Sequence, residues 1–307
     1  MARSGGALKR RNFLFGAAGL FLTGLSAEKT KEKGLQERII PSSGEKIPVI
    51  GIGTWQTFDV SEKSSSFSEL EKLLALFQEK GGKLIDSSPM YGNSEKISGI
   101  LGKKLGREKF IYATKVWTSG ESSGKNQIRE SFHRFQAEKI EIFQIHNLLD
   151  WKTHIKTLRE LKESGKIKYI GITHYVRSAF PEMEKIMKSE KIDFIQIPYS
   201  VQEREAEKRI LPLSEEKGIA VLVNRPFEGG DLFRRFKGKS VPEFAKDFQS
   251  DSIAGLLLKF ILHRKEVTCI IPATSKTSHL SENMQAGAGR IPDRSEAEKI
   301  LQFFSDN

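Results

Sequence analysis

The chain has 307 residues, of which 38% are hydrophobic and 29% charged, a composition typical of a globular enzyme with a sizeable core. Its formal net charge is +11, and Arg3, Lys9, Arg10 and Arg11 supply four of these charges near the N-terminus. The other basic residues alternate with acids, which argues against the dense basic face of a nucleic-acid-binding protein.

The first 27 residues have the pattern of an export signal. A basic stretch ends in Lys9-Arg10-Arg11-Asn12-Phe13-Leu14, and an apolar run softened by Gly and Ala occupies residues 13–25. The paired arginines resemble the twin-arginine export motif. We therefore predict a twin-arginine signal peptide at 1–27, a charged linker at 28–36, and export through that machinery to the bacterial periplasm. A chance basic segment and an uncleaved membrane anchor are the alternatives.

From residue 37 to residue 307 the sequence predicts one domain, in which a small hairpin precedes alternating strands and helices. Short apolar runs predict strands at 50–55, 83–87, 110–116, 140–147, 169–174, 194–200, 219–224 and 267–273. Amphipathic stretches predict helices at 67–80, 95–105, 125–138, 154–164, 178–190, 203–216, 252–264 and 278–286. Residues 228–250 are expected to form a long loop that covers a ligand.

This alternation favours a closed (β/α)8 barrel, the TIM barrel. A doubly wound sheet is the alternative. Such a sheet usually carries three spaced glycines after its first strand when it binds a dinucleotide. Gly51 and Gly53 occupy the first two of those positions, but Gln56 stands at the third. The incomplete fingerprint therefore favours the barrel.

Four side chains suited to proton transfer follow successive predicted strands. Asp86 and Lys115 end the second and third strands, and His146 ends the fourth. Tyr91 lies in the turn just beyond Asp86. Strand ends converge on one mouth of a TIM barrel, where a lysine ammonium would lower the tyrosine pKa from its usual ~10. Each residue alone has a commonplace structural role, but the four together predict acid–base catalysis, with a neutral His146 orienting a carbonyl group.

These motifs resemble those of the aldo-keto reductases over roughly residues 37–285. The resemblance implies a barrel enzyme that reduces aldehydes or ketones with NADP(H), although NAD(H) is possible. It implies that Tyr91 is the proton donor, that Asp86 and Lys115 tune it, and that His146 orients a small carbonyl substrate. Oligomerisation is expected to be absent or weak.

The resemblance also implies a cofactor site. The segment 270–276 is similar to the family's phosphate-binding segment, so that Ser275 and Lys276 would hold phosphates. Ala273 and His279 replace basic residues that often contact the 2′-phosphate, which leaves the preference for NADP over NAD open. The implied cofactor contacts are Gly53, Thr54, Trp55, Asp86, Thr173, His174, Gln196, Asn224, Arg225, Pro226, Phe227, Thr274, Ser275, Lys276, His279, Glu282 and Asn283.

Around the nicotinamide, Gln196 matches the family's amide ligand. The family's usual Ser-Asn pair is replaced by Thr173 and His174. The stacking aromatic that commonly follows the seventh strand is missing, and Arg225 or Phe227 would take its place.

An apolar pocket lined by Trp55, Phe58 and Trp117, together with Tyr91 and His146, would receive the substrate. We expect this mouth to be open, because few residues follow the predicted last helix. A regulatory protein that binds the cofactor with little turnover, and another barrel enzyme such as a lyase or isomerase, remain alternatives. No metal site is expected, because the histidines lack ligand spacing and the single cysteine lies in an apolar run.

Overall fold

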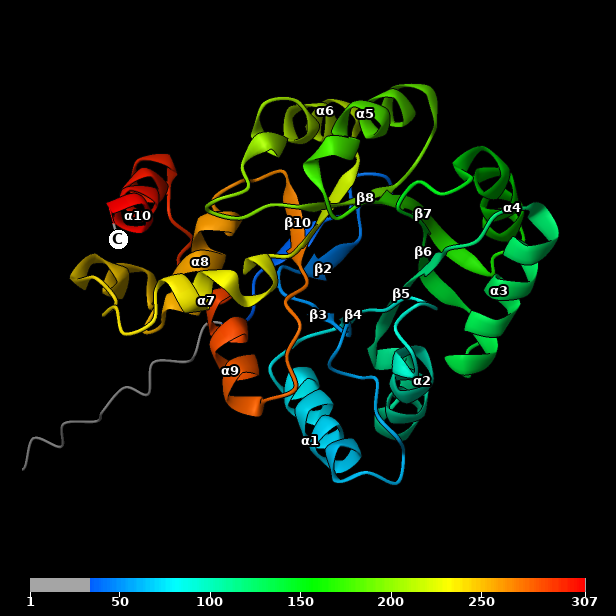
Figure 1. Cartoon of the computed structure of the whole chain (residues 1–307), viewed down its shortest axis with the longest axis horizontal. Helices are drawn as coiled ribbons and strands as arrows, with labels where there is room; N and C mark the ends of the chain where they lie inside the picture. The colour runs from blue at the N-terminus through cyan, green and yellow to red at the C-terminus, as the bar shows by residue number, and fades with distance from the viewer. Residues whose placement is uncertain (1–33, 307) are drawn as a thin grey trace, which may run out of the picture. The chain divides into compact units, whose positions relative to one another are not determined.

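The computed structural model describes residues 34–306, so the predicted signal peptide lies outside the described residues. Eight parallel strands form one sheet in which each strand pairs with the next along the chain. They are β3 (Ile52–Gly53), β4 (Leu84–Asp86), β5 (Ile111–Val116), β6 (Ile140–His146), β7 (Ile167–Thr173), β8 (Phe194–Pro198), β9 (Ala220–Asn224) and β10 (Val267–Ile270). Helices surround these strands in Figure 1, and the predicted (β/α)8 barrel is confirmed.

The ten α-helices of the described residues follow the predicted alternation, with two additions. They are α1 (Ser65–Glu79), α2 (Ser94–Leu105), α3 (Glu121–Arg134), α4 (Trp151–Glu163), α5 (Phe180–Ser189), α6 (Ile210–Lys217), α7 (Asp231–Arg235), α8 (Ile253–Leu262), α9 (Thr277–Ala286) and α10 (Arg294–Asp306). No helix in this part of the chain is both long enough and apolar enough to cross a membrane.

The additions, α7 and α10, correct two predictions. Residues 228–250 contain α7 and a 3-10 helix at Glu243–Phe248, so this segment is not a simple loop. The segment after α9 is not a short tail either, because α10 buries Ala297, Ile300 and Phe304. Phe304 packs edge-on against Phe236, which follows α7, with the ring centroids 4.8 Å apart. These two elements therefore support each other beside α8.

Two glycines at the first strand allow the barrel to close. Gly51 donates its N–H to the Ile270 carbonyl at 2.8 Å, and Gly53 forms a parallel bridge with Ala273. A Cβ atom on Gly51 would lie 2.9 Å from the Leu84 carbonyl oxygen, closer than such atoms pack. One on Gly53 would lie equally close to the carbonyl oxygen of residue 271. Close backbone approach therefore explains these glycines without a dinucleotide fingerprint.

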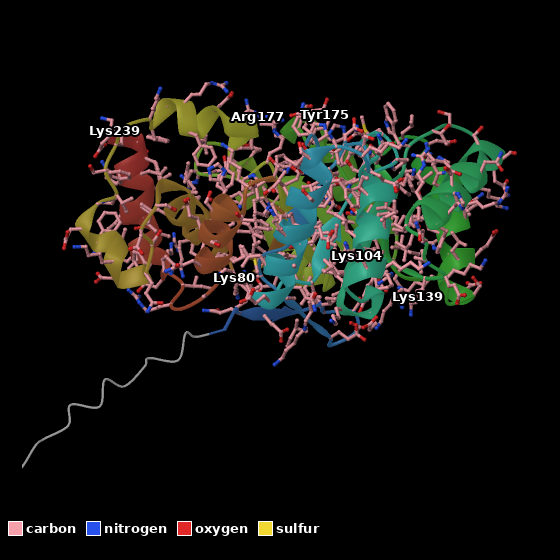
Figure 2. The ribbon with its side chains drawn as sticks, turned by 90° about the horizontal axis from the view of Figure 1, so that it is seen from below. Lys80, Lys104, Lys139, Tyr175, Arg177 and Lys239 are labelled. Carbon is pink, nitrogen blue, oxygen red and sulfur yellow. The ribbon has the colours of Figure 1, made fainter. Side chains whose placement is uncertain are left out.

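The N-terminal hairpin, β1 (Glu37–Ile39) and β2 (Lys46–Pro48), supplies residues to the barrel interior. Ile40 and Ile47 pack in one buried cluster with barrel residues: Leu84, Ala113, Ile142, Tyr169, Phe194, Ala220, Leu222, Cys269 and Ile271. Figure 2 shows the hairpin at the end of the barrel opposite the labelled Tyr175 and Arg177. The hairpin therefore leaves the other end, where the strands terminate, available for a site.

Arg38 attaches this hairpin to the end of α8. Its guanidinium donates to the carbonyls of Leu262, Arg264 and Val267, with 2.7 Å to the Arg264 oxygen. Burial lowers the pKa of Arg38 to about 10. These acceptors include carbonyls at a helix C-terminus, where a cation is favoured.

We expect Arg38→Met to lower the free energy of unfolding by about 2 kcal/mol, the scale of a lost hydrogen bond to a charged group. Urea denaturation measures this loss. Arg129→Met, which removes an exposed arginine from α3, is the matched control and should change stability by less than ~0.5 kcal/mol. Equal stability of the two variants would show that the Arg38 contacts contribute nothing.

Candidate active site

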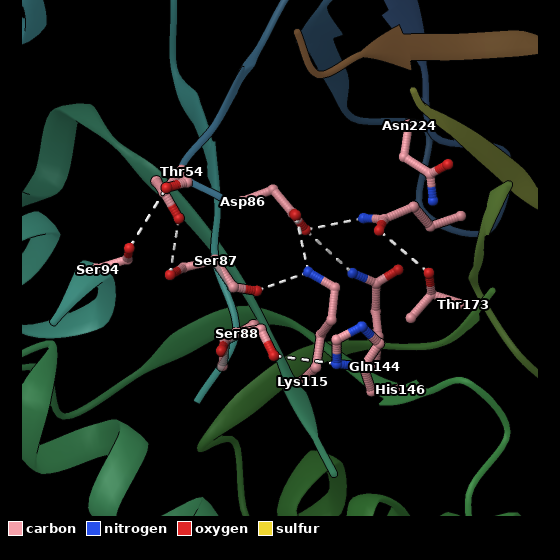
Figure 3. Close-up of polar contacts among 12 residues, drawn as sticks. Thr54, Asp86, Ser87, Ser88, Ser94, Lys115, Gln144, His146, Thr173 and Asn224 are labelled. Atoms are coloured by element: carbon pink, nitrogen blue, oxygen red, sulfur yellow. Dashed lines mark hydrogen bonds and ion pairs between the residues drawn. The ribbon is translucent and has the colours of Figure 1, made fainter. Parts of the chain in front are cut away.

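A buried ion pair lies where β4 and β5 end. Lys115 Nζ donates to Asp86 Oδ2 at 2.7 Å and to the Ser87 carbonyl at 2.6 Å. The two charged side chains are only 0% and 4% exposed. The parallel pairing of β4 with β5 brings the two side chains together, because Asp86 lies opposite Ala113, two residues before Lys115. The predicted partnership of Asp86 with Lys115 is therefore present (Figure 3).

The second oxygen of Asp86 receives two amides from other strands. Gln196 Nε2 donates to Asp86 Oδ1 at 2.8 Å, and Gln144 Nε2 lies 3.4 Å from the same atom. Thr173 Oγ1 donates to the Gln196 carbonyl oxygen at 3.1 Å. The amide of Gln196 is thus used at both ends inside the protein. Its shortest contact is with the Asp86 carboxylate, whereas the family resemblance implies a contact with the nicotinamide.

Tyr91 lies between the lysine and the histidine. Lys115 Nζ is 5.4 Å from the centroid of the Tyr91 ring, and the His146 ring meets it edge-on with centroids 6.0 Å apart. Burial, with a smaller contribution from the Asp86 carboxylate, raises the pKa of Tyr91 above its ordinary value. The predicted lowering of this pKa is wrong. The ammonium is already paired with Asp86 and faces the ring, so burial decides the direction.

His146 is held as a neutral imidazole. It is 6% exposed, and its Nδ1 lies 3.0 Å from Ser88 Oγ. Burial, together with the positive charge of Lys115, lowers the pKa of His146 to about 2. The predicted neutral ring, which the orientation of a carbonyl group requires, agrees with this lowered pKa.

Large apolar side chains are exposed at this end of the barrel. Trp55 is 46% exposed, Met90 42% and Trp117 40%. The Trp117 ring lies 6.3 Å from the His146 ring, centroid to centroid. Phe58 does not join them: it is fully buried in the core between sheet and helices, so its predicted contact with substrate is wrong. Met90 was missed, although it directly precedes Tyr91.

One residue predicted to contact the nicotinamide, Arg225, lines a surface hollow. The loops after β7, β8 and β9 enclose about 550 Å³, lined by Tyr175, Arg177, Pro198, Gln202, Arg225 and Glu228. Next to it, Asn224 Nδ2 donates to the His174 carbonyl at 3.2 Å, while Asn224 Oδ1 is buried without a partner among the described residues. Of the two predicted stacking residues, Arg225 lines the hollow. Phe227 instead packs on Phe233 of α7 at 4.7 Å between ring centroids.

The predicted phosphate segment follows β10 and leads into α9. Thr274 is buried and accepts the Lys276 N–H through its hydroxyl at 3.1 Å. Ser275, Lys276, His279 and Glu282 are exposed, whereas Asn283 is buried. No side chain caps the start of α9. The free N–H groups of its first turn, beside Lys276 and His279, suit an anionic phosphate.

Residues 49–299 match the model of the aldo/keto reductase family. The chain belongs to this family. Among relatives, it is 27% identical to the Bacillus subtilis aldo-keto reductase YhdN over 70% of this chain and 67% of that protein. It is 24% identical to the Escherichia coli methylglyoxal reductase YeaE over 81% of this chain and 89% of that protein.

Solved structures of this family share the fold. An aldo/keto reductase from Klebsiella pneumoniae in complex with NADP and acetate superposes with a TM-score of 0.74, at 18% identity. The superposition covers 88% of this chain and 96% of that one. The holo form of an aldo-keto reductase from Bacillus halodurans gives 0.72 at 22% identity, covering 88% and 96%. As a family member, the chain is an NAD(P)H-dependent oxidoreductase.

Two polar residues of this reductase site were missed in the sequence. Ser88 and Gln144 contact the catalytic candidates, but single serines and glutamines near strand ends have many possible roles. Gln144 lies two residues before His146 in β6, and strand alternation turns these two side chains toward the same face, which was an available signal. Ser88 lies beyond the end of β4, where no such periodicity applies. Within residues 34–306, no group of three or more His, Cys, Asp or Glu side chains could hold a metal ion.

Proposed function

We propose that this protein reduces aldehydes or ketones to alcohols with NADP(H), and that Tyr91 donates the proton. The observation that carries this proposal is the grouping of a protonated Tyr91, a neutral His146 and the buried Lys115–Asp86 pair at one barrel mouth. A carbonyl reduction needs a proton donor and an orienting hydrogen bond at the oxygen, and this group offers both.

Each side chain has one task. NADPH, when bound, supplies the hydride. His146 donates a hydrogen bond from its ring and orients the carbonyl oxygen. Tyr91 transfers its hydroxyl proton to that oxygen, a form of general acid catalysis worth roughly 10²–10⁴-fold. The Lys115 ammonium over the tyrosine ring stabilises negative charge that develops on the phenol, and Asp86 keeps that ammonium charged and in place.

The described residues fit a nicotinamide dinucleotide. The unpartnered Asn224 Oδ1 would accept a hydrogen bond from the carboxamide, and Arg225 would place its guanidinium plane against the ring in the adjoining hollow. Lys276 and the start of α9 would hold phosphate. The NADP and NADPH complexes of similar barrels support the choice of NADP(H), but Ala273 supplies no charge for a 2′-phosphate.

The deciding experiment uses the protein without residues 1–27. This protein is titrated with NADPH and, separately, with NADH, and binding is monitored by fluorescence. A panel of aldehydes and quinones is then added while NADPH absorbance is recorded. Binding with turnover supports the proposal. Binding without turnover of any substrate would favour a regulatory cofactor-binding protein, and absence of binding by either nucleotide would remove the proposed mechanism.

We also propose that residues 1–27 direct twin-arginine export to the periplasm, on the strength of the Arg10-Arg11 pattern. We expect the double variant Arg10→Lys/Arg11→Lys to leave the protein in the cytoplasm as the uncleaved precursor. Cell fractionation and N-terminal sequencing measure this. Arg3→Lys, outside the motif, is the control and should be exported like the wild type. Export of the double variant would exclude this route.

A further inference from the structure

Ser88 contacts the ring of His146 through its side chain, and it has no role among the catalytic steps proposed for Tyr91, Lys115 and Asp86. Its Oγ lies 3.0 Å from His146 Nδ1 (Figure 3). Ser88 is 0% exposed and His146 6%. The adjacent Ser87 has a different partner, since its Oγ accepts from Thr54 Oγ1 at 2.9 Å. Of these two serines, Ser88 alone can therefore act on the histidine ring.

The direction of this hydrogen bond follows from the single hydrogen of the hydroxyl. A buried hydroxyl hydrogen needs an acceptor. Ser88 Oγ is approached by the Met90 N–H at 3.5 Å, which can only donate to it. Among the contacts of residues 34–306, His146 Nδ1 is the acceptor within reach. Ser88 thus donates to Nδ1, and Nδ1 carries no hydrogen.

We propose that Ser88 is a positioning residue that fixes His146 as the Nε2–H tautomer. A neutral imidazole has one N–H, and the hydrogen bond at one nitrogen determines which nitrogen carries it. With Nδ1 accepting from Ser88, Nε2 is the donor. The opposite tautomer would present a lone pair to a carbonyl oxygen and repel it. The effect of this tautomer on catalysis rests on the proposed carbonyl reduction. The assignment of the hydrogen to Nε2 does not.

The tautomer is measured directly by long-range ¹H–¹⁵N correlation spectra of the ¹⁵N-labelled protein, which distinguish protonated from unprotonated ring nitrogens. A spectrum of His146→Gln assigns the signal. We expect an Nε2–H ring in the wild type at neutral pH and a changed or mixed tautomer in Ser88→Ala. An Nδ1–H ring in the wild type, or an unchanged signal in Ser88→Ala, would overturn the proposal without any turnover being needed.

Kinetics test the consequence. We expect Ser88→Ala to lower kcat/KM for carbonyl reduction about tenfold, the scale of one lost neutral hydrogen bond, with the Kd for NADPH unchanged. Ser88→Cys keeps a weak donor and should recover part of the loss. Ser214→Ala is the matched control, because it removes a buried serine hydrogen bond, 2.7 Å to the Leu211 carbonyl, on α6.

The two proposals fail in different ways. If the wild type reduces no carbonyl compound, the proposed function falls while the spectra still decide the tautomer. If the wild type is active and Ser88→Ala keeps the kcat/KM of Ser214→Ala, the positioning role of Ser88 is wrong and carbonyl reduction stands.

Discussion

Replacement of Tyr91 by phenylalanine is expected to lower kcat by about 10²–10⁴-fold, the contribution of a positioned general acid. The ring remains, so its contacts with Lys115 and His146 are kept. None of the hydrogen bonds within residues 34–306 uses the Tyr91 hydroxyl, so folding should be unchanged. The Kd for NADPH should stay close to that of the wild type, because only one hydroxyl group is removed.

Tyr169→Phe provides the matched control. Tyr169 lies in β7 and is buried, and its hydroxyl bonds to Ser43 and Glu45, on the side of the hairpin. We expect wild-type turnover from it. Substantial turnover by Tyr91→Phe, with the control also active, would remove Tyr91 as the acid and leave the source of the proton open.

The raised pKa of Tyr91 predicts a reduction rate that does not depend on pH near neutrality. Burial keeps the phenol protonated beyond its ordinary value of ~10, so the reduction rate should not fall between about pH 7 and about pH 9 through loss of this proton. His146, whose pKa is about 2, should cause no acid loss near neutrality. The pH profile of kcat/KM tests both expectations. A decline of kcat/KM between about pH 7 and about pH 9 that occurs in the wild type but not in Tyr91→Phe would contradict them.

The sequence predicted that Asp86, Tyr91, Lys115 and His146 lie together because its signal is local. Apolar runs define the strands, and Asp86, Lys115 and His146 occur at or near their ends, where a barrel brings side chains together. The same signal existed for α10, whose Ala297, Ile300 and Phe304 have helical spacing. The predicted helices nevertheless end at residue 286, before this segment.

Other features depended on packing that sequence spacing does not encode. Phe58 follows the first strand like Trp55, yet one side chain is buried and the other exposed. Whether the pKa of Tyr91 is raised or lowered depends on the balance between burial and the charge of Lys115, which is already paired with Asp86. The hydrogen bond from Ser88 to His146 depends on the exact orientation of two side chains, one in the loop after β4 and one at the end of β6.

Lys115→Met is expected to cause the largest loss of stability, about 3–5 kcal/mol, because it leaves the Asp86 carboxylate buried without its cation. The two amides that remain on Asp86 satisfy hydrogen bonds but supply no charge. Urea denaturation measures the loss. In the double variant Asp86→Asn/Lys115→Met neither charge remains, and the amide can still accept from Gln196, so we expect part of the stability to return.

A second buried lysine, Lys259, serves as the control for Lys115→Met. It shows how much stability is lost when a buried lysine without a carboxylate partner is removed. Lys259 in α8 is also fully buried, and its Nζ donates to the carbonyls of Ala288 and Arg290 at 2.6 and 2.8 Å. Burial lowers its pKa to about 8. Lys259→Met leaves two neutral acceptors and no unpaired charge, so it should cost about 1–3 kcal/mol and keep turnover. An equal loss in both variants, with no recovery in the double variant, would mean that the Asp86–Lys115 pair stabilises the barrel only through packing.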